Sequence, residues 1–239
     1  MATEIQGVYA SYDLLTPEKA RALWDEGYRV FSQQLWTAAE QPANRVINLR
    51  AAYEQGFKLV GPIATNSSRP GGWHVWQARA GVPDDLWAAL LLTPIDVELE
   101  NIPNTDVRNA VETARDFGKR RCLYYSTHTW VDYQGNPDGF ADCMTYFARY
   151  DGVAALPGSA VLPPSMRSSA IVGKQYTNTL ITGNLETCRE VWNQELLIGA
   201  PVPVPVPAPT LESLDASVKF LSSVVVNLAA RVRALEGGS

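Results

Sequence analysis

A helix, a glycine, an aromatic or basic residue and then an apolar strand recur three times along the chain. The junctions between helix and strand are Glu26-Gly27-Tyr28, Gln55-Gly56-Phe57 and Phe117-Gly118-Lys119. Each unit is about 30 residues long, which is the length that a crossover between two parallel strands requires. The strands are nearly continuous apolar runs, as is typical of a parallel sheet covered by helices. The sequence therefore predicts an α/β fold built from βαβ units.

The expected elements follow this rhythm as far as residue 126 and become less regular after it. We predict strands at 5–12, 28–36, 57–64, 93–100, 121–126, 142–150 and 170–177, and helices at 17–26, 44–55, 73–80, 84–90, 104–117 and 185–197. Neither a G-x-G-x-x-G nor a Walker pattern is present, which favours a barrel over a dinucleotide-binding fold. We predict an irregular (β/α) TIM-like barrel over residues 1–198.

A proline-rich segment separates this barrel from the end of the chain. Proline alternates with valine or alanine from Pro201 to Pro209, a pattern that excludes a helix and favours stiff polyproline II. At about 3.1 Å per residue the segment is roughly 28 Å long. We assign residues 199–209 as a polyproline linker.

The last 30 residues carry apolar side chains three and four positions apart. These residues are Leu211, Leu214, Val218, Leu221, Val225, Leu228, Val232 and Leu235. The spacing predicts a coiled-coil oligomerisation helix over 210–239. Val224 and Ala229 widen the apolar seam, which favours more than two chains and indicates a homotrimer. The alternative is an amphipathic helix folded back onto the barrel, and the stiff linker counts against it.

Composition excludes several classes of partner. The 239 residues carry a net charge of −5 and contain no block of Lys or Arg, so nucleic acid is not expected. The sequence has no run of about 18 apolar residues, so no membrane span is expected. The first four residues are short and acidic, unlike a signal peptide. Three widely spaced cysteines, Cys122, Cys143 and Cys188, fit synthesis in a reducing cytoplasm.

The stretch Thr93 to Glu100 is the strongest candidate for a chemical site. In a strand, Asp96, Glu98 and Glu100 lie on one face because side chains alternate. Two carboxylates held close together at the end of a buried strand cannot both ionise freely, so one keeps its proton and can act as a general acid. The alternative is an exposed edge strand with a solvated acidic face.

Other candidate sites are weaker. His74 and His128 are the only histidines and do not lie at metal-binding spacing, so no metal and no cofactor are expected. Ser126, His128 and Asp132 could suggest a hydrolase triad, but no nucleophile elbow surrounds the serine. Trp130 and Trp73 lie in loop-rich neighbourhoods and are candidates for contact with a ligand.

Six short motifs occur in an order that points to a known family. They are Gly7-Val8-Tyr9-Ala10-Ser11, Tyr53-Glu54-Gln55-Gly56-Phe57-Lys58-Leu59-Val60-Gly61, Ile95-Asp96-Val97-Glu98, Leu123-Tyr124-Tyr125-Ser126, Tyr146-Phe147-Ala148-Arg149-Tyr150 and Gln175-Tyr176-Thr177. Over residues 5–197 the chain resembles the family 25 glycoside hydrolases, which are lysozyme-like muramidases with an irregular (β/α) barrel. The resemblance implies bacterial cell-wall glycan as the ligand.

The same resemblance assigns roles to individual residues. Glu98 would be the general acid that protonates the glycosidic oxygen. Asp96 would tune Glu98 or orient the acetamido group of the substrate. The residues expected to line the sugar groove, with Trp130 added from its loop position, are Tyr9, Tyr124, Tyr125, Trp130, Tyr150, Gln175 and Tyr176.

The chain also departs from the family pattern. Tyr9 stands where the family has its first-strand carboxylate, and Asn184 stands near the position of the last one. Nearby negative charge stabilises an oxocarbenium-like transition state, so these replacements would lower the rate. Whether the domain is an enzyme therefore stays open between two hypotheses. One is a lysozyme-like domain that binds and hydrolyses cell-wall glycan, and the other is a catalytically degenerate structural or adhesion module.

The architecture indicates a setting for either hypothesis. An oligomerising coil without a signal peptide is typical of a bacteriophage virion or tail component made in the host cytoplasm. This interpretation implies two kinds of partner. One is further copies of the same chain, bound through residues 210–239, and the other is other virion proteins.

Overall fold

The computed structural model describes residues 3–10, 12–98, 102–126, 140–162, 168–177, 180–182 and 185–199. Residues 1–203 form one compact unit. The predicted coil at 210–239 and all but the first residue of the predicted linker at 199–209 lie outside the described residues. The domain boundaries and the trimer therefore stay predictions.

The described part of the chain alternates strands and helices. Its strands are β1 (Glu4–Ala10), β2 (Val30–Gln33), β3 (Trp36–Thr37), β4 (Lys58–Val60), β5 (Ile63–Ala64), β6 (Leu90–Leu92), β7 (Ile95–Asp96), β8 (Cys122–Ser126), β9 (Met144–Ala148), β10 (Ile171–Gln175), β11 (Leu180–Thr182) and β12 (Leu185–Asn193). Its helices are α1 (Pro17–Asp25), α2 (Arg45–Gln55), α3 (Gly71–Ala80), α4 (Asp84–Ala89), α5 (Asn104–Asp116) and α7 (Gln194–Ile198), with a 3₁₀ turn at Ser159–Val161. No helix among these residues is long and apolar enough to cross a membrane.

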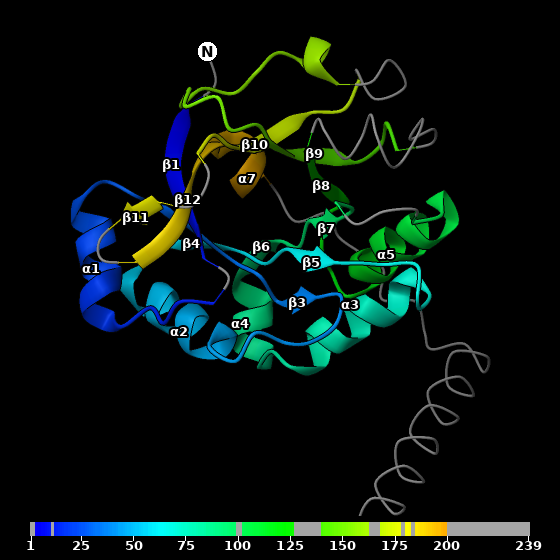
Figure 1. Cartoon of the computed structure of the whole chain (residues 1–239), viewed down its shortest axis with the longest axis horizontal. Helices are drawn as coiled ribbons and strands as arrows, with labels where there is room; N and C mark the ends of the chain where they lie inside the picture. Colours follow the sequence, from blue (N-terminus) through cyan, green and yellow to red (C-terminus); the bar gives the residue numbers. More distant parts are fainter. Residues whose placement is uncertain are drawn as a thin grey trace, which may run out of the picture. The chain divides into compact units, whose positions relative to one another are not determined.

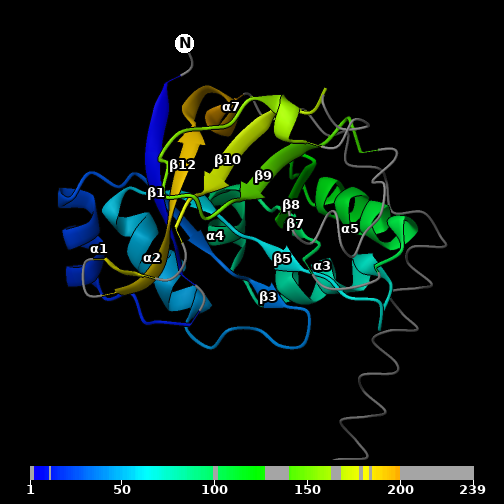
Figure 2. The ribbon, with the colours of Figure 1, turned by 45° about the horizontal axis from the view of Figure 1, so that its top comes forward.

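The strand pairings run around a ring. Parallel pairs link β1 to β2, β4 and β6 in turn, and link β3, β5, β7, β8, β9 and β10 in turn. Strand β12 pairs antiparallel with both β10 and β1 (Figures 1 and 2). Because β3, β5 and β7 continue the strands that begin as β2, β4 and β6, the pairings lead back to β1. The predicted irregular (β/α) TIM-like barrel is confirmed.

Two of the three interrupted strands are broken at prolines. Pro62 separates β4 from β5 and Pro94 separates β6 from β7. Proline has no N–H to donate to a neighbouring strand, so regular pairing stops there. The strands stay together across the breaks, because Gly61 N donates to Leu92 O and Ile63 N to Pro94 O, each at 2.9 Å.

Local sequence signals set the helix ends as predicted. The Thr16 hydroxyl accepts from Lys19 N at 3.3 Å, and Pro17 begins α1. The glycines at the three repeated junctions, Gly27, Gly56 and Gly118, have φ of 99°, 98° and 81°. These values lie in the left-handed region that ends helices and favours glycine.

The apolar residues form two cores, one between the sheet and the helices and one inside the barrel. The interior core consists of Val30, Val60, Leu92, Cys122, Tyr124, Tyr146, Ala148, Val172, Trp192 and Leu197. Trp192 fits there because Gly7 and Gly173 face it without side chains. A Cβ atom on Gly7 would lie 2.8 Å from Trp192 Nε1, and one on Gly173 would overlap the indole ring.

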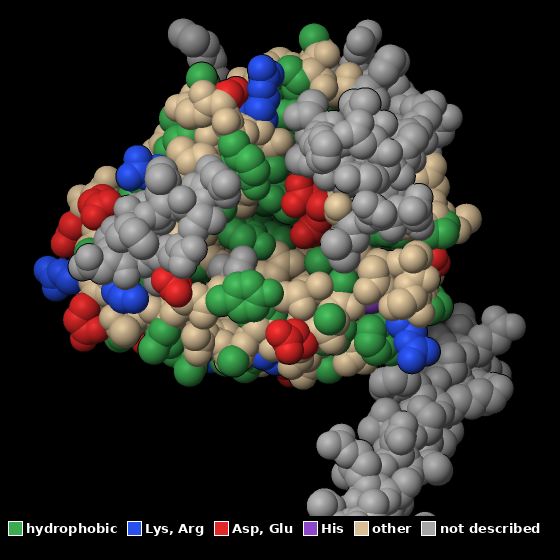
Figure 3. Space-filling view, viewed as in Figure 1, with side chains coloured by type: hydrophobic (Ala, Val, Ile, Leu, Met, Phe, Trp, Pro, Cys, Tyr) green, Lys and Arg blue, Asp and Glu red, His purple; other side chains and the backbone are tan. Residues whose placement is uncertain are grey.

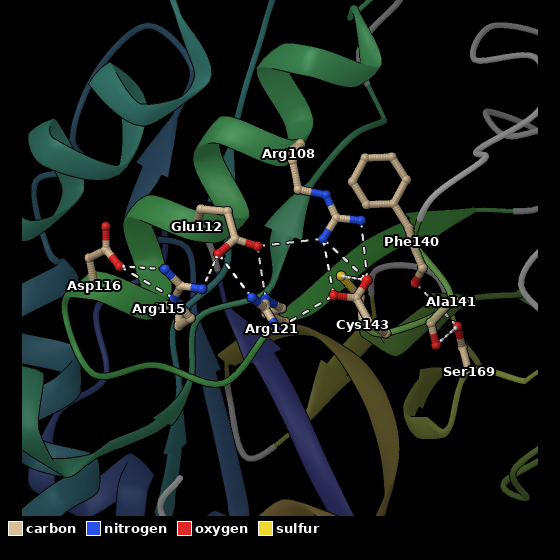
Figure 4. A network of polar contacts seen from close by, with 10 residues as sticks. Arg108, Glu112, Arg115, Asp116, Arg121, Phe140, Ala141, Cys143 and Ser169 are labelled. Atoms are coloured by element: carbon tan, nitrogen blue, oxygen red, sulfur yellow. Dashed lines mark hydrogen bonds and ion pairs between the residues drawn. The ribbon is translucent and has the colours of Figure 1, made fainter. Parts of the chain in front are cut away.

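An ion-pair network on the outside of the barrel fixes α5 against β8 and β9 (Figure 4). Glu112 on α5 accepts from Arg121, which directly precedes β8, with Nε to Oε1 at 2.8 Å. Arg108 reaches Asp142, which precedes β9, at 3.1 Å. The side chains are partly exposed, so each pair contributes about 0.2–1 kcal/mol. The network holds the starting ends of these strands, opposite the ends that carry Asp96 and Tyr150.

The prediction of a helix over 185–197 is wrong. Residues Leu185–Asn193 form strand β12, and only Gln194–Ile198 is helical, beginning where Asn193 Oδ1 accepts from Leu196 N at 3.0 Å. The segment has partners on both sides, β1 and β10, and this pairing outweighs its local helical spacing. The antiparallel direction of β12 also breaks the βαβ rhythm on which the prediction depended.

Candidate active site

Asp96 and Glu98 lie where β7 ends, at the edge formed by the carboxyl ends of the parallel strands. Neighbouring strands hold the backbone there, since Thr65 N donates to Asp96 O and Val97 N to Tyr124 O, each at 3.1 Å. Glu98 N donates to Asp96 Oδ1 at 3.0 Å. Both side chains are partly buried. In such barrels this end of the strands carries the chemistry.

The Asp96 carboxyl holds its proton more tightly than an ordinary aspartate. Burial raises its pKa well above the usual range, and the Glu98 carboxylate raises it further. Loss of a second proton from such a pair creates two adjacent charges in a poorly solvated place. The pair therefore titrates as a unit and retains a proton at a pH where isolated carboxyls are ionised.

Tyrosines from three other strands gather around this pair. Burial raises the pKa of Tyr124, and the charges of Glu98 and Asp96 and the tyrosines Tyr150 and Tyr9 raise it further, which places these groups within electrostatic reach of one another. Burial also raises the pKa of Tyr150 to about 12, with Glu98 again contributing. The structure thus brings together Tyr9, Tyr124 and Tyr150 with the two predicted catalytic residues.

Gln175 joins two of these tyrosines. Its Oε1 accepts from the Tyr124 hydroxyl at 2.9 Å and from the Tyr150 hydroxyl at 3.1 Å. Gln175 is 1% exposed, whereas Tyr150 is 52% exposed. The structure therefore places Gln175 beside the site, with its side chain beneath the tyrosines.

Tyr176 does not join this group. Its hydroxyl donates to Gln6 Oε1 at 2.9 Å, and burial raises its pKa, with Tyr28 raising it further and Arg189 lowering it. Successive side chains of a strand point to opposite faces, so Tyr176 and Gln175 cannot both face the same interior. The side chains of Tyr125 and Ser126 and the whole of Trp130, His128, Asp132, Asn184 and Glu100 lie outside the described part of the chain.

Sequence reasoning missed Glu190, a carboxyl group inside the barrel. Glu190 is 0% exposed, and its carboxylate accepts from Ser32 Oγ at 2.7 Å, from Trp192 Nε1 at 2.8 Å and from the Tyr146 hydroxyl. Burial raises its pKa to about 7, against the lowering effect of these donors. The helix predicted for 185–197 concealed it, whereas an alternating strand pattern places 188, 190 and 192 on one face.

Aromatic residues also pack beside the ends of β3 and β5. Trp73 is partly buried and contacts Trp36 and His74 edge to face, with ring centroids 5.6 Å and 5.2 Å away. The His74 ring is buried and its Nδ1 accepts from Trp36 Nε1 at 2.9 Å. Burial lowers the pKa of His74, so its ring is neutral at pH 7. Among the described residues no group of three potential metal ligands occurs.

The surface at the strand ends is hollowed. Figure 3 shows acidic side chains, over the region that Figure 1 labels β7, beside a depression with hydrophobic side chains in it. Apolar and aromatic surfaces suit the faces of sugar rings, and a protonated carboxyl can donate to a bridging oxygen. The arrangement can thus bind a polyhydroxyl ligand and deliver a proton to it.

The barrel has the fold of family 25 glycosyl hydrolases and lysozymes. A family 25 glycosyl hydrolase from Bacillus anthracis aligns with a TM-score of 0.62 at 17% identity, over 83% of this chain and 94% of that one. A lysozyme from Streptomyces coelicolor aligns with a TM-score of 0.64 at 16% identity, over 83% and 97%. The autolysin LytC from Streptococcus pneumoniae, solved with a synthetic peptidoglycan ligand, aligns with 0.57 at 13%, over 79% and 46%. No family model and no curated protein matches the sequence.

Proposed function

We propose that this barrel binds bacterial cell-wall glycan and hydrolyses it at the Asp96–Glu98 pair. The observation that carries the proposal is that pair itself, held at the carboxyl end of β7 with a raised pKa for Asp96. The shared fold supports the same conclusion, since the aligned proteins include lysozymes and an autolysin solved with a peptidoglycan ligand.

The proposed chemistry assigns one role to each carboxyl. Glu98 protonates the glycosidic oxygen as the bond to the anomeric carbon breaks, and a water molecule adds to that carbon and gives up a proton, which restores the acid. The two carboxyls share one proton, which the raised pKa of Asp96 retains near neutral pH and which Glu98 passes to the leaving oxygen. The aromatic residues Tyr9, Tyr124 and Tyr150 line the sugar groove beside them. These roles follow from the chemistry of the groups and from their common location.

Purified protein incubated with peptidoglycan tests the proposal. We expect release of reducing ends by the wild type and none by Glu98→Gln, which keeps the shape of the side chain and cannot donate an acidic proton. Glu54→Gln, on the exposed face of α2, is the matched control and should behave as wild type. Equal release by Glu98→Gln and wild type would exclude Glu98 as the acid.

A second candidate function is glycan binding without hydrolysis. It is favoured by the pairing of β1 with β12, in which Tyr9 lies opposite Cys188, so that neither position supplies a carboxylate. Pelleting with cell walls distinguishes the two candidates. Binding without release of reducing ends supports the adhesion module, and neither binding nor release supports a purely structural role.

We also propose that the domain is displayed on an oligomer as part of a bacteriophage virion or tail. The alternation of proline with valine at 201–209 and the heptad spacing at 210–239 support a stiff linker followed by a trimeric coil. Other virion proteins would be the partners of such an assembly. Recovery of the protein from purified virions would support this setting, and its absence from them would exclude it.

A further inference from the structure

Glu190 lies in the barrel interior with hydrogen-bond donors on several sides. Ser32 on β2, Tyr146 on β9 and Trp192 on β12 all donate to its two oxygens. The indole N–H of Trp192 can only donate, so it favours an oxygen that accepts. The site is therefore arranged around an ionised carboxylate in a place where ionisation is costly, because no described basic side chain forms an ion pair with it.

Gln175 lies between Glu190 and the candidate active site. Both tyrosine hydroxyls donate to Oε1, so the amide nitrogen Nε2 points away from the tyrosines. Nε2 is buried and completes no hydrogen bond among the described residues. Gln175 nevertheless lowers the pKa of Glu190, so Glu190 is the acceptor nearest in effect to this N–H group. An ionised Glu190 attracts this N–H group and so holds the amide in one orientation.

Ring stacking provides a second connection between the same residues. Tyr146, which donates to Glu190, stacks on Tyr124 with ring centroids 4.5 Å apart and on Trp192 with centroids 4.6 Å apart. A change in the hydrogen bonding of Glu190 therefore reaches Tyr124 in two ways. One is the Gln175 amide, which accepts from Tyr124, and the other is the stacked Tyr146 ring.

We propose that Glu190 is a positioning residue that makes the site recognise hydrogen-bond donors of the ligand. When Glu190 is ionised, Gln175 offers its oxygen to Tyr124 and Tyr150. Both hydroxyl protons then point toward Gln175, and the lone pairs of the half-exposed Tyr150 hydroxyl face the groove. Those lone pairs accept from sugar O–H groups or from an acetamido N–H. The ligand class in this inference rests on the proposed function. The coupling between Glu190 and the tyrosines does not depend on it.

Protonation of Glu190 reverses this arrangement. A protonated carboxyl donates one hydrogen bond of its own, so it holds the Gln175 amide less firmly and the tyrosine protons can turn outward. The titratable groups facing Glu190 are tyrosines, with Tyr146 in contact, Tyr124 and Tyr9 next to Tyr146, and Tyr176 more distant. Tyr146, Tyr124 and Tyr176 stay neutral near pH 7, where Glu190 itself changes charge, because burial raises their pKa values above that of an ordinary tyrosine.

Binding of a soluble peptidoglycan fragment, measured by calorimetry from pH 5.5 to 8.5, tests the proposal. We expect wild-type affinity to rise about fivefold with pH, the worth of one hydrogen bond, with a midpoint near 7. Glu190→Gln should lose this component. Ser32→Ala removes one donor to the carboxylate, so the midpoint should move to higher pH. A midpoint that Ser32→Ala leaves in place, or a profile that Glu190→Gln retains, would overturn the proposal.

A second measurement separates this inference from the proposed function. The ¹³Cζ resonances of Tyr124 and Tyr150 in the ligand-free protein report on the donor state of their hydroxyls. We expect them to shift with pH at the Glu190 midpoint, and this midpoint should rise in Ser32→Ala. If the resonances shift in this way but no glycan binds, the proposed ligand is refuted and the coupling between Glu190 and the tyrosines is supported. Resonances that do not respond to the Glu190 midpoint would refute the coupling whatever the glycan does.

Discussion

The backbone N–H of Glu98 donates to Oδ1 of Asp96 at 3.0 Å. This bond fixes the Asp96 carboxyl beside the backbone from which the Glu98 side chain extends, so the two acids stay neighbours whatever the groove contains. A carboxyl pair held in this way responds to pH as one group, and its response can be measured.

Asp96→Asn should move the alkaline limb of the glycan-hydrolysis profile to lower pH. Burial and the charge of Glu98 raise the pKa of Asp96, so Asp96 retains the proton of the pair. Without Asp96 the site loses that proton at lower pH, and general acid catalysis lasts only while the pair holds a proton. The release of reducing ends as a function of pH measures the shift. An unmoved alkaline limb would show that the pair is not coupled.

Glu190 should make the protein less stable as the pH rises through neutrality. Its pKa is about 7 in the fold and about 4.3 in an unfolded chain. The folded state therefore binds more protons between these values, and stability falls as pH rises from about 4.3 to 7, by about 4 kcal/mol. Urea unfolding at several pH values measures the slope. Glu190→Gln should flatten it, and an unchanged slope would contradict the assignment.

Gly173→Ala should destabilise the barrel. The added methyl group would overlap the Trp192 ring, and overpacking of a filled core costs about 1–3 kcal/mol. Gly158→Ala is the matched control, because no atom lies within 4 Å of a Cβ placed there. Denaturant midpoints of the two variants decide the matter. Equal midpoints would mean that the indole moves freely inside the barrel.

Asp151→Asn should also destabilise the fold, by removing the charged partner of a buried cation. Lys174 is 1% exposed and its Nζ lies 2.7 Å from Asp151 Oδ1. Asp151 is itself partly exposed, and Lys174 Nζ keeps its hydrogen bond to Val153 O at 3.0 Å, so losing the ion pair costs about 1–3 kcal/mol. The double variant Asp151→Asn with Lys174→Met should recover much of the loss in a thermal unfolding experiment. No recovery would show that Asp151 acts through something other than Lys174.

Truncation after Leu197 should convert the oligomer into a monomer. The apolar spacing that predicts self-association lies wholly beyond that residue. Light scattering of the full chain and of the truncated chain gives both masses. A full chain that is already monomeric would refute the predicted coil.

The barrel could be predicted because its first five strands and the helices between them follow one repeating pattern. The glycines at 27, 56 and 118 mark helix ends in the sequence and have positive φ in the structure. The pattern failed at β12, whose direction is opposite to the other barrel strands. The adjacent apolar residues Val191 and Trp192 interrupt the alternation of a strand and also fit a helix. Only the two neighbouring strands, which the sequence does not reveal, identify the segment as a strand.

The site was predictable to the extent that ordered motifs indicate strand ends. Asp96, Glu98, Tyr124 and Tyr150 come together because each lies on or just after a strand of the parallel part of the barrel. The motif does not reveal which of two adjacent residues faces the interior, and the structure places the Tyr176 hydroxyl against Gln6. Glu190 was missed because its role depends on donors 44 and 158 residues away.

The fit of Trp192 between Gly7 and Gly173 limits how this barrel can evolve. Neither glycine can acquire a side chain while the indole occupies the space between them. A smaller residue at 192 would open a cavity and remove a donor to Glu190. The three positions are thus expected to change only as a set, and related sequences should keep two glycines with a tryptophan or lose all three together.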